Sequence, residues 1–158
     1  GLGGGTPVTI EGTGFLTGVT VSIGGSPCGS LVPLSSNTLT CVTGANTAGT
    51  KSIVVTNSDT QSGTLTNAYV YQPAPTVSAM NPNSGSTEGG TSVTLTGTGF
   101  LTGARVTVGG SDCTSVVVTP PTTISCTTAS HSVGPATVIV TNADGQSGTL
   151  IDGFTFQN

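Results

Sequence analysis

The chain has 158 residues, a formal net charge of −4 and only two basic side chains. Two cations are too few to neutralise a row of nucleic-acid phosphates or to hold the chain on an anionic bilayer, so the composition excludes both kinds of partner. The mean hydropathy is slightly positive and only 5% of the residues are charged, which excludes a disordered chain kept open by its charge.

An internal repeat sets the domain organisation. Residues 12–18 and 97–103 share the sequence GTGFLTG, and a shift of 85 positions aligns 73 residues without a gap, of which 33 are identical. A repeat of this period predicts two domains with one fold, residues 1–72 and 76–158. We expect the proline-containing junction at residues 73–75 to be stiff, so that the domains stand end to end with limited bending.

Alternating apolar residues, with abundant glycine and β-branched side chains, predict strands rather than helices in both repeats. In chain order the first repeat offers strands at 6–11, 19–23, on either side of 34–35, and at 51–57 and 65–71. Their partners in the second repeat are 93–95, 104–108, 113–118, 123–128, 136–142 and 150–156. The apolar runs at 53–55 and 138–140 predict the most buried strands, and four alternating aromatics are expected in the core: Tyr69, Tyr71, Phe154 and Phe156.

One more short strand is predicted at residues 76–82, where it opens the second repeat. The first repeat has no counterpart, because the residues that would align with this strand precede Gly1. Two explanations are open. Either the sequence was taken from a longer array, or the first domain is completed by a strand of another chain.

Four cysteines form two pairs with equal spacing, one pair in each repeat: Cys28, Cys41, Cys113 and Cys126. A lone pair supplies only two ligands to a zinc ion, so one disulfide in each repeat is the better interpretation. A hairpin about residues 119–122 places Cys113 directly opposite Cys126, within the distance that a disulfide spans. Closing each loop contributes on the order of 3 kcal/mol, and disulfides predict an oxidising, extracytoplasmic location.

The remaining polar residues offer no repeated catalytic or metal-binding pattern. His131 lies in a polar loop and is expected to be solvated, as is Arg105 on the polar face of its strand. Asn142, Asp144 and Gln146 place oxygens at alternate positions, but Ca²⁺ needs about six to eight ligands, so a hairpin turn is the preferred interpretation. We therefore expect no enzyme activity, no cofactor and no metal site.

Turn and core motifs follow one another through the second repeat at 82–85, 88–91, 97–100, 108–110, 113, 126, 140–145 and 154–156. As a set these motifs resemble the IPT/TIG domain, and the ungapped repeat extends the resemblance to residues 1–72. The resemblance implies two immunoglobulin-like β-sandwiches of about seven strands each, the first without its opening strand. It also implies a bacterial cell-surface or extracellular protein. The family's DNA-contacting members use basic loops that this chain lacks.

These observations predict a non-catalytic structural module, either a rigid spacer or a subunit of a surface stalk, adhesin or filament that assembles by strand complementation. The alternative is a carbohydrate- or protein-binding accessory module of a larger secreted protein. The expected partners are further copies of the chain or neighbouring repeats, or a surface glycan or host protein, with neither nucleic acid nor membrane insertion. The expected location is extracellular or at the cell surface, and the sequence points to no particular interaction residues.

Overall fold

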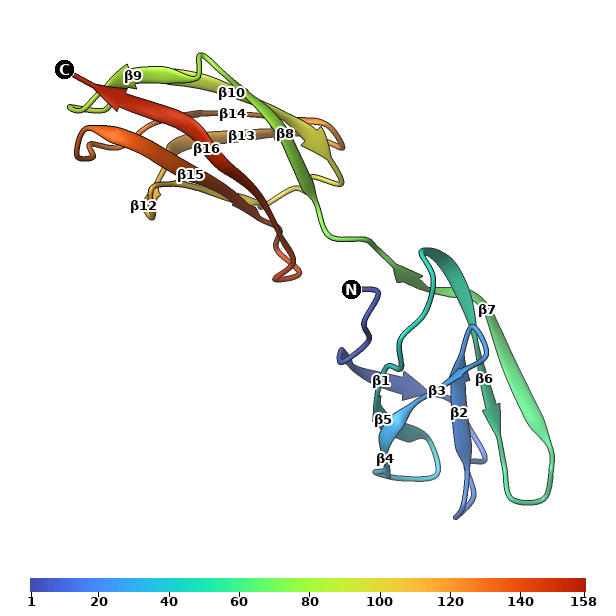
Figure 1. Cartoon of the computed structure of the whole chain (residues 1–158). Helices are drawn as coiled ribbons and strands as arrows, with labels where there is room; N and C mark the ends of the chain where they lie inside the picture. The colour runs from blue at the N-terminus through green and yellow to red at the C-terminus, as the bar shows by residue number, and fades with distance from the viewer. The chain divides into compact units, whose positions relative to one another are not determined.

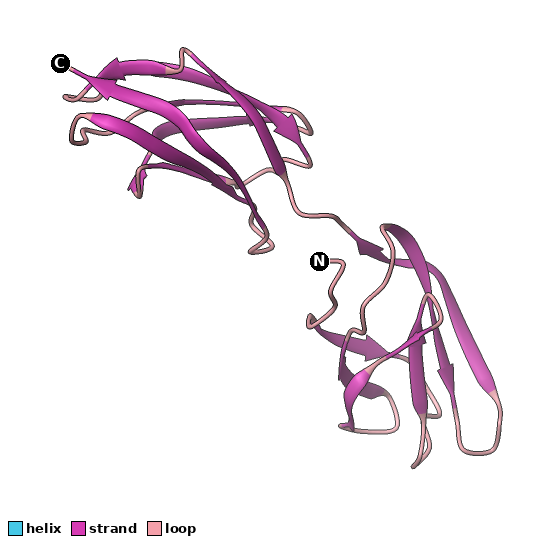
Figure 2. Cartoon of the chain, viewed as in Figure 1, coloured by secondary structure: helices cyan, strands magenta, loops and turns pink.

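The computed structural model describes all 158 residues and contains strands and loops but no helix (Figure 2). The chain divides into two compact units, unit 1 over Gly1–Pro73 and unit 2 over Ala74–Asn158 (Figure 1). Each unit contains two sheets that enclose its own apolar core. The all-β, twin-sandwich prediction is therefore confirmed.

Unit 1 has seven strands in two antiparallel sheets, ordered β1-β5-β4 and β3-β2-β6-β7. Glycine-rich turns separate strands of four to ten residues, apart from the two-residue β3, as the alternating pattern requires. The bounds are β1 Pro7–Glu11, β2 Thr20–Ile23, β3 Ser26–Pro27, β4 Gly29–Pro33, β5 Thr38–Val42, β6 Gly49–Thr56 and β7 Ser62–Tyr71.

Unit 2 repeats this arrangement and adds β8 and β9, so that its sheets are ordered β13-β14-β10-β8 and β12-β11-β15-β16-β9. Only the short pairing of β9 with β16 is parallel. The bounds are β8 Thr76–Asn81, β9 Ser84–Ser86, β10 Ser92–Thr98, β11 Arg105–Val108, β12 Ser111–Asp112, β13 Thr114–Thr119, β14 Thr123–Thr127, β15 Gly134–Thr141 and β16 Ser147–Gln157.

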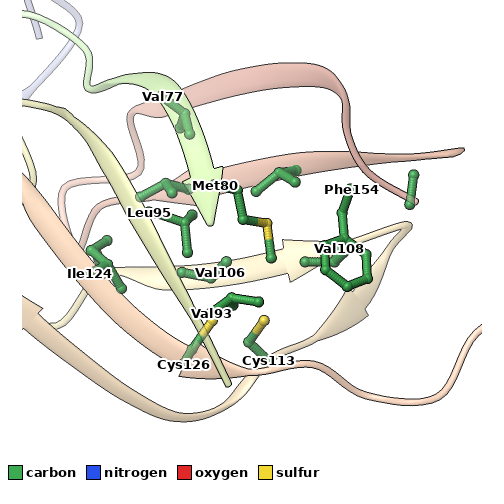
Figure 3. Packing of buried hydrophobic residues seen from close by; sticks show 14 of the residues in the cluster. Val77, Met80, Val93, Leu95, Val106, Val108, Cys113, Ile124, Cys126 and Phe154 are labelled. Carbon is green, nitrogen blue, oxygen red and sulfur yellow. The ribbon is translucent and has the colours of Figure 1, made fainter. Parts of the chain in front are cut away.

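The strand that opens unit 2 is part of its core. Strand β8 pairs antiparallel with β10 and also packs against β16 of the facing sheet. Its Val77 and Met80 side chains are buried and point among those of Leu95 and Val106 (Figure 3). Within residues 1–73, unit 1 has no strand on the corresponding side of β1.

Burial agrees with the predicted core in unit 2 more closely than in unit 1. Phe154 and Phe156 are fully buried, as is Tyr71, whereas Tyr69 is half-buried. The prediction that residues 53–55 form the most buried strand of unit 1 is wrong. In β6 only Ile53 is buried, because nothing covers the part of the sandwich that β8 covers in unit 2.

The predicted register of the cysteine hairpins is also wrong. Thr114 pairs with Thr127, and a β-bulge lies between Thr114 and Val117, so Cys113 is not opposite Cys126. Ser115 in this bulge has a φ of 51°, which lies in the left-handed region and not in the range of a regular strand. Unit 1 has the same bulge between Gly29 and Val32.

Candidate functional site

The repeated GTGFLTG segment is held by a buried asparagine from a distant turn. In unit 2 the Asn142 side-chain nitrogen donates to the carbonyl oxygen of Gly99 at 2.8 Å, and its oxygen accepts from the Leu101 amide at 3.1 Å. Asn57 makes the same two bonds to Gly14 and Leu16 in unit 1. The repeated motif therefore fixes a loop, and the amide oxygen of Asn142 is already engaged.

The acidic turn beside Asn142 is likewise built from local hydrogen bonds. One Asp144 carboxylate oxygen accepts from the Gln146 amide at 3.1 Å and the other from its side-chain nitrogen at 2.9 Å. The backbone carbonyl oxygen of Asn142 also closes the turn, because it accepts from the Gly145 N–H. These hydrogen bonds all join residues of the same turn, as in an ordinary hairpin turn.

His131 is not the solvated loop residue that we expected. Its ring is half-buried and stacks on Phe156, with centroids 4.9 Å apart and an interplanar angle of 23°. Its Nε2 atom lies 3.2 Å from the carbonyl oxygen of Gly109. The aligned Asn46 caps the equivalent turn of unit 1 by donating to Gly24, so both residues close a Gly-Gly turn.

The charged residues form one surface ion pair. Arg105 is exposed, as predicted, and its guanidinium donates to both Asp112 carboxylate oxygens at 2.9 and 2.8 Å. Both side chains are more than half exposed, so the pair contributes little to stability.

The four cysteines carry free thiols and lie in two pairs, one within each unit. The backbone N–H of Cys113 donates to Val106 of β11, whereas Cys126 lies on β14 of the opposite sheet. Figure 3 shows the Cys113 and Cys126 side chains beside one another, and each thiol shifts the pKa of the other. Each pair therefore lies between the two sheets rather than across one hairpin.

The environment of the pairs keeps the deeper thiol protonated. Burial, with a hydrogen bond to Cys28, raises the pKa of Cys41 to about 12. The hydrogen bond to Cys113 and burial raise the pKa of Cys126 in the same way, while that bond lowers the pKa of Cys113. In unit 2 the pKa of Cys113 is the lower one, and the thiolate is the form of cysteine that attacks to make a disulfide.

Sequence reasoning missed a groove on unit 1. It has a volume of about 470 Å³ and lies between the end of β1 with the following GTGF turn and the inner faces of β6 and β7. Its apolar lining includes Ile10, Phe15, Val55 and Leu65. The signal was present in the sequence, because these residues align with ones that β8 covers in unit 2.

Fold and site together define an immunoglobulin-like β-sandwich module that is repeated in tandem and carries no assembled reactive cluster. The IPT/TIG domain matches residues 2–71 and again residues 75–156. The chain belongs to the IPT/TIG family, as the motifs predicted.

Two curated relatives are mammalian. Human Fibrocystin-L is 34% identical over 160 residues, which cover 96% of this chain and 4% of that protein. Mouse Fibrocystin-L is 33% identical over 140 residues, which cover 82% of the chain and 3% of the mouse protein. The chain thus spans only a few per cent of the length of these relatives, and the bacterial setting stays a prediction.

A solved structure of the full extracellular region of plexin A4 has the same fold. It superposes with a TM-score of 0.54 at 23% identity and covers 99% of this chain and 17% of the plexin chain. No helix in the structure has the length and apolar character needed to cross a membrane.

Proposed function

We propose that the chain is a non-catalytic extracellular module that serves as a spacer and an assembly element in a larger surface protein. The observation that carries the proposal is that the polar residues shared by both repeats form hydrogen bonds within turns. Asn57 and Asn142 hold turns, and the aspartates of the same turns bond within them, so no polar cluster faces a substrate. Membership of the IPT/TIG family and the fold shared with an extracellular plexin region support this role.

As a spacer, the chain is a rigid segment of a stalk, adhesin or filament. The two prolines of the junction, Pro73 and Pro75, support stiffness because each fixes a backbone dihedral. Small-angle scattering of the intact chain tests this directly. We expect a maximum dimension close to the sum of two sandwich lengths, and a compact two-lobed particle would reject the spacer role.

The proposed location rests on the cysteine pairs. We infer that Cys28 with Cys41 and Cys113 with Cys126 are oxidised to disulfides, each thiol giving up one proton and one electron to an external thiol–disulfide oxidant. The thiol contacts within each pair support this pairing. Non-reducing peptide mass spectrometry of secreted material should find only these two links. Free thiols, or a link between units, would contradict both the pairing and the extracytoplasmic location.

The second candidate is a binding module for a glycan or a protein. Sugar sites use exposed aromatic faces, and here Tyr71, Phe100, Phe154 and Phe156 are fully buried. The open groove of unit 1 instead favours a protein partner, because its edge offers backbone groups and its floor is apolar. A glycan-array screen of the intact chain separates the two, since reproducible glycan binding would favour the sugar.

A further inference from the structure

Strand β13 forms the outer edge of its sheet in unit 2. The sheet is ordered β13-β14-β10-β8, so only one side of β13 meets a neighbouring strand. Unit 1 has the same edge in β4, which lies beside β5 alone. The two strands align at the offset of 85 residues, so one chain offers two versions of the same edge for comparison.

The hydrogen-bond pattern of the sheet shows which residues of β13 turn their backbone groups outward. The Gly97 N–H of β10 donates to the carbonyl oxygen of Thr122, the residue before β14, so even-numbered residues of β14 face β10. Because backbone groups alternate along a strand, odd-numbered residues such as Ser125 face β13. Val117 pairs with Ser125 and therefore turns its N–H and carbonyl toward β14. The next residue, Val118, turns its own backbone groups toward the open edge.

Unit 1 has a proline at this outward-facing position. Pro33 aligns with Val118 and is the last residue of β4. Proline has no N–H, so the edge of unit 1 lacks the donor that a further strand needs. A proline on an edge strand is one of the common protections against pairing with another chain. The edge of unit 2 lacks this protection, because Val118 keeps its N–H.

The side chains of the open edge are uncharged and mostly apolar. Residues 114–119 have the sequence TSVVVT, a segment of high β-propensity without charge, proline or glycine. Val116 and Val118 pack against the core of unit 2, whereas Val117 lies on the outer face and is 59% exposed. The β-bulge before Val117 and the two prolines after the strand confine the regular edge to residues 116–119. The open edge is therefore short, neutral and apolar.

We propose that the β13 edge of unit 2 pairs antiparallel with the β13 edge of a second copy of this chain. A two-fold axis at Val117 places Val116 of each chain opposite Val118 of the other, which forms about four backbone hydrogen bonds. Val117 then faces its own counterpart, about 4.5 Å away between Cα atoms. Any charge near this axis would meet a like charge, and residues 114–119 carry none. The inference rests on the assembly part of the proposed function and is independent of the spacer part.

The expected dimer is weak and closed. Stable interfaces bury about 1,200–2,000 Å², whereas four residues of a strand extend only about 13 Å. The dimer should therefore form at high concentration, as when many chains are held on one surface. Because each chain uses the same edge, the contact is complete at two copies.

Sedimentation equilibrium of the intact chain, up to about 1 mM, measures the association. We expect a reversible equilibrium between monomer and dimer, and a chain that stays monomeric throughout would overturn the proposal. Val118→Pro gives unit 2 the residue that unit 1 carries at the aligned position, and it should weaken dimerisation at least about tenfold. Equal dimerisation of this folded variant and the unchanged chain would place the contact elsewhere and overturn the proposal.

The reverse substitution opens the edge of unit 1. Pro33→Val restores the N–H that β4 lacks, so each chain then has two edges that can pair. Chains joined at both units should form species larger than dimers in the same sedimentation measurement. Dimers alone would overturn the proposal, because the proline would then not be what closes the edge of unit 1.

Charges at Val117 test the register, because this side chain is exposed and its replacement leaves the core untouched. Val117→Lys and Val117→Glu should each abolish dimerisation, since like charges meet on the two-fold axis. An equimolar mixture of the two variants should recover it as a heterodimer. Val32→Lys, at the aligned position of unit 1, is the matched control and should dimerise like the unchanged chain. A mixture that stays monomeric would overturn the proposal.

Two further measurements keep the possible failures apart. NMR spectra of each variant at low concentration should match those of the unchanged chain away from the substituted strand, so that a lost fold is not mistaken for a lost dimer. If Val118→Pro unfolds unit 2, the Val117 variants test the same contact without changing the backbone. Small-angle scattering of the monomeric Val117→Lys variant tests the spacer role separately, because that role needs only one chain.

Discussion

Replacing Gly148 of unit 2 by alanine tests the packing of β8 most directly, because Gly63 of unit 1 supplies a matched control. Neither glycine has a positive φ, so alanine meets no backbone strain at either site. The added methyl at position 148 would clash with the Pro75 carbonyl oxygen and would lie 2.8 Å from the carbon of that carbonyl group. At position 63 the methyl enters open space.

The expected magnitudes follow from these distances. Overpacking against a backbone costs about 1–3 kcal/mol, while replacing glycine in a compatible conformation stabilises by about 0.4–1 kcal/mol through the unfolded chain. Gly63→Ala should therefore be neutral or slightly stabilising for unit 1. Gly148→Ala should destabilise unit 2 by about 1–2 kcal/mol, which lowers the Tm of a domain of this size by roughly 4–16 °C.

Native-state hydrogen exchange of the intact chain reports each unit separately. The amides of Ile10 in β1 and Leu95 in β10 follow the stability of their own units, and Thr96 reports whether β8 stays attached. We expect Gly148→Ala to accelerate exchange at Thr96 most of all. Equal effects of the two substitutions, each in its own unit, would refute the reasoning, because the two sites would then be equally open.

Three further results are expected. Asn142→Ala removes two hydrogen bonds from a buried loop and should destabilise unit 2 by about 1–3 kcal/mol in urea unfolding. Asn57→Ala should destabilise unit 1 by less, because Asn57 is half-buried. Equal losses of stability in the two variants would argue against burial as the cause. His131→Asn should recover part of the stability lost in His131→Ala, since asparagine already caps the equivalent turn of unit 1, and no recovery would mean that stacking on Phe156 dominates. In the reduced protein, burial raises the pKa of Cys41 from its ordinary value of 9.0, which the unfolded chain keeps, to about 12. The stability that this thiol contributes to unit 1 should therefore be fully present below pH 9 and fall between pH 9 and 12, whereas the oxidised protein should lack that loss. Identical pH profiles of the two forms would contradict this reasoning.

The alternation of apolar and polar side chains predicted the strands well, because this alternation depends only on residues a few positions apart. The alternation of Val8 and Ile10, and of Phe154 and Phe156, places the same side chains on the inner faces that the structure shows. The hairpin around residues 119–122 also forms. In these segments the period of the side chains alone decides which face is buried.

The cysteine register could not be predicted from that period. Ser115 and Ser30 adopt a positive φ, which glycine and asparagine favour more than serine, so the sequence carries no clear bulge signal. The bulge shifts the pairing and places Cys113 beside β11 instead of opposite Cys126. His131 was misjudged for a similar reason, since its partner Phe156 lies 25 positions away and only the fold brings them together.

The two repeats together carry information that neither has alone. In unit 2 glycine at positions 97 and 148 is required by the approach of β8. In unit 1, Gly63 keeps the same residue type although an alanine would fit, and glycine inside a strand is less stable than alanine by roughly 0.5–1 kcal/mol. Leu65 is 62% exposed, whereas the aligned Leu150 is half-buried against the core of unit 2. The residues that line the groove of unit 1 align, at an offset of 85 positions, with residues that form the closed core of unit 2.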